Sequence, residues 1–172
     1  MNLMLLRIFQ GQVALQCRFM VRAAIDVNTG LGRRDPEQTF YALQNFLNAG
    51  ANVSKALWGQ GGKFEKKRRA LRDSIGVDNN SPFKQVTMRN NFEHFDERLD
   101  QWWKQSKRHN YIDLNLMSRP GIIGANKNDC FRTFDPSSST LTFWSQDFNL
   151  KELMDEVQKI LPRLETEAAK PH

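Results

Sequence analysis

The polar run from Arg89 to His94 carries side chains suited to phosphate chemistry. The imidazole of a histidine such as His94 can give or take a proton near neutral pH, and the guanidinium of Arg89 presents several N–H donors in one plane. At about 100° per helical residue, Asn90 and His94 are neighbours on one face, as are Arg89 and Glu93. Two interpretations follow: a face that contacts RNA phosphate, or a solvated face on which the Arg89–Glu93 pair contributes little.

The opposite face of the same segment is apolar. Residues at alternating steps of four and three form one stripe, which predicts a helix packed through that side and starting at an N-cap, Ser81, followed by Pro82. The polar residues, including Glu93 and Glu97, then point away from the packed side. The stripe consists of Met88, Phe92, Phe95, Leu99 and Trp102.

The run Arg89-Asn90-Asn91-Phe92-Glu93-His94 resembles the R-x(4–6)-H motif of the HEPN family (higher eukaryotes and prokaryotes nucleotide-binding), with the usual polar residue directly after the arginine. In that family the motif lies near the start of the last core helix of an up-and-down four-helix bundle. Here it lies in the fourth helix that the sequence predicts. The resemblance covers residues 1–107 in architecture and six residues in motif.

This resemblance implies a metal-independent endoribonuclease that acts as a homodimer, with two motifs facing each other across a shared cleft and no cofactor. His94 would then be the general acid or base, Arg89 would hold the scissile phosphate, and Asn90 would orient one of them. Family members include toxins and phage-defence effectors, which implies an antitoxin or regulatory protein as a partner. Other members are inactive and only bind nucleic acid or protein. Glu93, beside His94, departs from the pattern because an acidic group repels phosphate.

A second candidate for RNA contact is a basic segment in a helix predicted over 64–75. Six cations within ten residues can follow a phosphate backbone, although a solvated helix face gives the same pattern. The six residues are Lys63, Lys66, Lys67, Arg68, Arg69 and Arg72.

Other chemistries fit the sequence poorly. The run from Glu93 to Glu97 is rich in possible ligands but is not H-E-x-x-H, so we expect no metal site. The glycines of 59–62 follow a helix rather than a strand and lack the Walker pattern of a phosphate-binding loop. Cys17 and Cys130 form no metal or redox motif, which favours a reducing compartment.

Length and composition bound the remaining possibilities. The 172 residues are 40% hydrophobic and 26% charged, as expected of one globular domain with or without an appendage. The formal net charge of +6 permits contact with polyanions. The apolar N-terminal stretch is interrupted by Arg7 and is too short for a leader or a membrane span, so we expect a cytoplasmic protein with no membrane partner.

The expected fold is mainly α: an up-and-down four-helix bundle, HEPN-like, over 1–107, followed over 108–172 by a small β element and a closing helix packed on the bundle. The second helix begins clearly, with Asp35 as N-cap, Pro36 in the first turn and Gln38 at N3. The last begins at Asn149 and is disturbed at Pro162. Periodicity predicts helices over 3–25, 35–58, 64–75, 81–107 and 149–164, a strand over 111–116, and a hairpin of 130–134 with 140–145.

Overall fold

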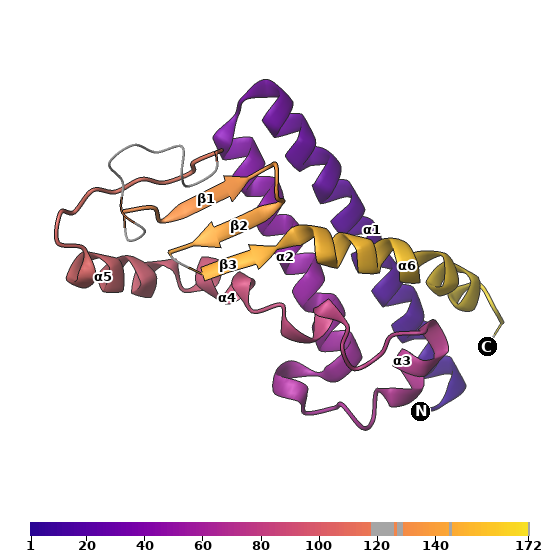
Figure 1. Ribbon diagram of the computed structural model, residues 1–172. Helices are drawn as coiled ribbons and strands as arrows, with labels where there is room; N and C mark the ends of the chain where they lie inside the picture. Colours follow the sequence, from indigo (N-terminus) through magenta and orange to yellow (C-terminus); the bar gives the residue numbers. More distant parts are fainter. Residues whose placement is uncertain (118–125, 127–128, 145, 172) are drawn as a thin grey trace. The chain divides into compact units, whose positions relative to one another are not determined.

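The computed structural model describes residues 1–117, 126, 129–144 and 146–171. It is mainly helical, with a small antiparallel sheet and a C-terminal helix, which confirms the predicted fold class (Figure 1). The helices are α1 (Leu3–Arg33), α2 (Pro36–Trp58), α3 (Arg69–Ile75), α4 (Met88–Glu93), α5 (Phe95–Gln105) and α6 (Leu150–Ala168), with 3₁₀ helices at Gln60–Gly62 and Pro82–Gln85. The strands are β1 (Arg132–Asp135), β2 (Thr140–Phe143) and β3 (Gln146–Asn149).

The chain forms two compact units. The helical unit consists of Met1–Ile25, Asn45–Val86 and Glu152–His172, and the sheet unit consists of Asp26–Gln44 and Thr87–Lys151. Helices α1 and α2 each contribute one end to each unit. These units do not coincide with the division near residue 108, which stays a prediction.

In the helical unit, α1, α2 and α6 come together at Gly50. A Cβ atom at this position would lie 3.4 Å from Met20 Cε and 3.6 Å from Leu153 Cδ1, so the absence of a side chain allows the three helices to approach closely. The apolar stripe of α6 recurs at steps of four and three and is fully covered, which explains why α6 continues through Pro162 to Ala168. The helix thus continues beyond Pro162, and a local disturbance at this residue stays a prediction. The stripe is Leu153, Val157, Ile160 and Leu164.

Helix α1 continues to Arg33, although the sequence predicted an end before Asn28. Gly30 lies where α1 touches α2: a Cβ there would be 2.5 Å from Thr39 Oγ1. The turn comes at Arg34, whose φ is 53°. The predicted start of α2 is confirmed, because Asp35 Oδ1 accepts the Gln38 N–H at 3.0 Å.

The sheet has the order β1-β2-β3, with Thr133 opposite Thr142 and Leu141 opposite Phe148. The predicted hairpin is confirmed as β1 and β2, although Ser145, its predicted end, lies outside the described residues. Strand β3 was not predicted, because Gln146–Asn149 is mostly polar.

The predicted strand over 111–116 was wrong. Only isolated bridges form there, Ile112 with Cys130 and Asn115 with Thr133, because Leu114 between them has a φ of 50° and interrupts the extended backbone.

Helix α6 follows β3 directly and begins as predicted, since Asn149 Oδ1 accepts the Lys151 N–H at 2.9 Å. Among the helices that the structure describes, none combines the length and the apolar character needed to cross a membrane.

Candidate functional site

The predicted fourth helix is interrupted, which changes the geometry of the Arg89–His94 run. Ser81 accepts the Phe83 N–H as predicted, but a 3₁₀ helix follows, and α4 and α5 are separated at His94, whose φ is −109° and ψ is 38°. The His94 N–H still donates to the Asn90 carbonyl at 3.0 Å, and the Arg98 N–H donates to the His94 carbonyl at 3.1 Å. The break is thus a kink that keeps its backbone hydrogen bonds.

The kink also divides the predicted apolar stripe. Met88, Phe92 and Trp102 are buried as predicted, whereas Phe95, directly after the kink, is 54% exposed. Continuity of one packed face across the kink was therefore a wrong prediction. The polar residues Asn90, Glu93, His94 and Glu97 are exposed, as the sequence indicated.

Arg89 has partners within its own helix. Its Nη1 lies 2.7 Å from Glu93 Oε1, and its Nη2 donates to Asn90 Oδ1 at 3.2 Å. Arg89 is partly buried in this pair, whereas Glu93 is more exposed. The structure thus brings Arg89 together with Asn90 and with the acidic residue that departs from the family motif.

His94 lies apart from this cluster. Its side chain is 55% exposed, and its Nδ1 is 3.7 Å from Glu97 Oε1 on α5. Within the described part of the chain, no hydrogen bond or ion pair joins Arg89 to His94. The residue that can transfer a proton is therefore open to solvent, next to Glu97 rather than Glu93.

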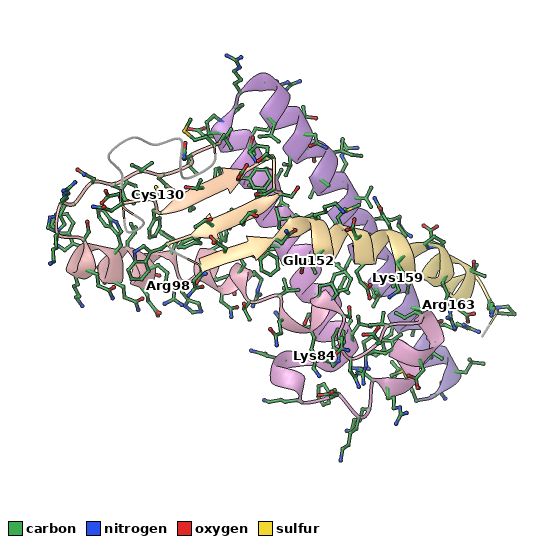
Figure 2. All side chains as sticks on the ribbon, viewed as in Figure 1. Lys84, Arg98, Cys130, Glu152, Lys159 and Arg163 are labelled. Atoms are coloured by element: carbon green, nitrogen blue, oxygen red, sulfur yellow. The ribbon has the colours of Figure 1, made fainter. Side chains whose placement is uncertain are left out.

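Asn91 fixes the position of the kink, and sequence reasoning missed it. This buried amide donates from Nδ2 to Gln146 Oε1 of β3 at 2.8 Å and accepts from Arg98 Nε of α5 at 3.0 Å (Arg98 is labelled in Figure 2). Phe92 packs edge-on against Phe143 of β2 at a centroid distance of 5.1 Å. The signal available in the sequence was an asparagine placed between two residues of the apolar stripe.

The basic segment is only partly helical, because α3 begins at Arg69 rather than near residue 64. Gly59, Gly61 and Gly62 all have positive φ, and the Phe64 N–H returns to the Trp58 carbonyl at 2.9 Å, so the chain turns here instead of forming a helix. Phe64, at the start of the predicted helix, is 41% exposed.

Two of the six predicted RNA-binding cations have structural partners instead. Arg72 is buried, donates from Nη1 to the Leu57 carbonyl at 2.7 Å and lies over the Trp58 ring at 5.4 Å. Arg68 stacks over Phe9 at 3.6 Å, and desolvation lowers its pKa.

The other four cations are exposed around one hollow of about 930 Å³ in the helical unit, which Arg72, Asp73 and Asp78 also line. Arg69 is 3.6 Å from Asp73, and Lys67 lies over the Phe64 ring at 5.6 Å. Glu65, which also lines the hollow, pairs with Lys84 at 3.1 Å (labelled in Figure 2). A partly neutralised but predominantly basic hollow remains, formed by Lys63, Lys66, Lys67 and Arg69, and we call it the basic hollow.

The side chains that could bind metal ions, and the two thiols, lie as follows in the described residues. These residues contain no group of three or more histidine, cysteine, aspartate or glutamate side chains placed to hold a metal ion. Cys17 and Cys130 are buried, and burial raises the pKa of Cys17 to about 12.

Comparison with known proteins leaves the family open. No protein-family model matches the chain, and neither the curated proteins nor the solved structures gave a significant match.

Proposed function

We propose that the chain is a metal-independent endoribonuclease that acts as a homodimer, with His94 as its proton-transfer residue. The observation that carries this proposal is the exposed imidazole of His94 at the kink, one helical turn after Arg89 and Asn90. A single exposed face encloses no substrate, whereas two such faces from two copies can form a cleft.

The reaction that this arrangement suits is an internal transesterification of RNA. One His94 removes the proton of a 2′-hydroxyl, the 2′-oxygen forms a bond to phosphorus, and the P–O5′ bond breaks. The leaving 5′-oxygen takes a proton from the second copy's His94, and Arg89 stabilises the added negative charge on the phosphate. The products are a 2′,3′-cyclic phosphate and a 5′-hydroxyl.

RNA cleavage in excess EDTA tests this proposal. We expect wild type to leave 2′,3′-cyclic phosphate ends and His94→Ala to lose the activity, while Asp100→Ala, an exposed change in the same helix α5, stays active. Folding of each variant is checked by circular dichroism. No cleavage of varied RNAs, or equal cleavage by wild type and His94→Ala, would exclude the catalytic assignment.

A second candidate is a catalytically silent RNA-binding module, and the Arg89–Glu93 pair favours it. With Glu93 Oε1 at 2.7 Å and Asn90 Oδ1 at 3.2 Å, the guanidinium of Arg89 already has acceptors and must leave one to bind a phosphate. Glu93→Gln removes the competing charge. If Glu93 restrains an active enzyme, this variant cleaves faster than wild type; a binding module gains affinity but no cleavage.

The basic hollow supports RNA binding under either candidate. Phosphate binding by cations releases counterions, so a variant that removes one such cation should reduce the salt dependence of single-strand affinity by roughly 0.7 in the log–log slope. Lys63→Glu with Lys66→Glu should weaken binding at low salt and flatten that slope. Affinity and slope equal to those of wild type would remove the basic hollow from the RNA-binding surface.

A further inference from the structure

An exposed pair of stacked rings lies at the end of α5 in the sheet unit. Trp103 is 59% exposed, and the His109 ring stacks on it with a centroid distance of 3.8 Å and an interplanar angle of 30°. The structure buries Trp102 and leaves Trp103 open to solvent.

His109 is held in place from three directions. Its backbone N–H donates to Ser106 Oγ at 3.0 Å, and its ring stacks on Trp103 of α5. Its Nε2 lies 3.2 Å from the Trp103 carbonyl oxygen, and since a carbonyl can only accept, Nε2 carries the proton of this hydrogen bond. The imidazole is thus fixed in one orientation before any ligand arrives.

A continuous set of aromatic contacts supports the pair from below. Trp102 meets His109 edge-on at 6.3 Å and Tyr111 at 5.0 Å, and Tyr111 contacts Phe131 at 5.5 Å. Phe131 in turn contacts Phe143 of β2 at 4.7 Å. The exposed rings are therefore the outer end of a packed aromatic cluster, which limits their movement.

Cations surround this end of α5. Lys104, Lys107 and Arg108 are exposed, and no ion pair in the described part of the chain involves them. A hollow of about 340 Å³ lies alongside, lined by Lys107, Arg108 and Ser106 together with Gln105, Asn126 and Asp129. Exposed aromatic faces and nearby cations are the two components of single-strand nucleic-acid recognition, in which rings stack on bases and cations hold phosphates.

We propose that Trp103 and His109 form a stacking platform for an unpaired base of single-stranded nucleic acid, with Lys104, Lys107 and Arg108 holding the flanking phosphates. This inference rests on the proposed RNA-binding function, but not on cleavage. The platform would bind single strands in preference to duplexes, because a paired base cannot present its face to the two rings. Stacking and phosphate contact are common to RNA and DNA, so the test includes both.

The experiment measures the affinity of fluorescein-labelled 12-mers of uridine and of deoxythymidine, by anisotropy at low salt. All proteins carry His94→Ala, so that cleavage does not interfere. Stacking of one base on an aromatic ring raises the affinity roughly five- to 150-fold. Trp103→Ala should therefore weaken binding by a factor in that range, and Trp103→Phe should weaken it by less. The matched control is Tyr41→Ala, which removes an aromatic ring that is 70% exposed on α2.

A second readout reports stacking directly. Base stacking on Trp103 quenches its fluorescence, and this quenching should be lost in Trp103→Phe even though the fold and most of the affinity persist. If the Trp103 variants bind RNA as tightly as the His94→Ala parent and show the same fluorescence quenching, the platform is overturned but the proposed RNA-binding function is not. No binding of any nucleic acid by wild type would overturn the platform and the proposed function together.

Discussion

Replacing Arg72 by methionine should destabilise the protein, because this arginine lines the basic hollow but is itself buried and bonded to the backbone of α2. Arg72 is 4% exposed, and its Nη1 donates at 2.7 Å to the carbonyl of Leu57, in the last turn of α2, where carbonyls lack helical partners. A hydrogen bond from a charged donor contributes about 1.5–3 kcal/mol. The contact with the Trp58 ring, at 5.4 Å, adds about 0.5–1 kcal/mol. Methionine keeps most of the aliphatic packing, so the expected loss is about 2–4 kcal/mol.

Urea titration and thermal unfolding measure this loss, and Arg69→Met is the matched control. At roughly 2–4 °C per kcal/mol for a chain of this length, Arg72→Met should lower Tm by about 4–16 °C. The Arg69 side chain is 78% exposed and its ion pair with Asp73 spans 3.6 Å, so its replacement should change stability little. In RNA-binding assays on folded protein at low temperature, Arg69→Met should weaken affinity and Arg72→Met should not. An unchanged Tm for Arg72→Met, with an affinity decrease equal to that of Arg69→Met, would refute the structural assignment of Arg72.

Three further predictions concern stability. Asn91→Ala leaves the hydrogen-bonding groups of Gln146 and Arg98 without their amide partner, and should lower the free energy of unfolding in urea by about 1–3 kcal/mol. The control Asn90→Ala, on the exposed side, should lower it little. Equal effects of the two changes would contradict the role of Asn91. Gly59→Ala should lower the free energy of unfolding by about 1–3 kcal/mol more than Gly61→Ala does. Both glycines have positive φ, but only at Gly59 would a Cβ lie 2.7 Å from Phe64. Similar urea unfolding midpoints for the two variants would argue against this contact. Burial raises the pKa of Cys17 to about 12, above its value in the unfolded chain, so its contribution to stability is complete below about pH 9 and is lost as pH rises toward 12. Cys17→Ala should flatten the decline of unfolding free energy over that range, and an identical decline in both proteins would refute the assignment.

Local signals in the sequence predicted the elements that local chemistry determines. Asp35 and Asn149 cap the helices that they were expected to begin, and the spacing of Leu153 and Val157 indicated a buried face of α6. These features depend on residues within one or two turns of each other.

The features that sequence reasoning missed depend on contacts between distant segments. Glycine is typical of turns, but Gly30 lies within α1 and allows α1 and α2 to approach each other. Only its contact with Thr39 of α2 reveals this role. Next to the kink at His94, Asn91 donates a hydrogen bond to Gln146 of β3. This strand was too polar to be predicted. Arg72 and Lys66 look alike in sequence, and only the fold shows that Arg72 is buried against the Trp58 ring whereas Lys66 is exposed. Residue types in the sequence could thus locate the candidate site, but they could not show which side chains are buried for structural reasons and which are exposed and able to bind a ligand.

The interleaving of the two compact units along the chain constrains the order in which they can be completed during synthesis on the ribosome. The helical unit takes segments from both ends of the described chain, and Leu153, Val157, Ile160 and Leu164 of α6 belong to its core. Until α6 emerges, the faces of α1 and α2 that it covers stay open to water, whereas every residue of the sheet unit precedes α6 apart from its first two positions. The sheet unit can therefore form while the nascent helical unit is still unfinished, and the long sequence separation between α1 and α6 should make closure of the helical unit a late and comparatively slow step.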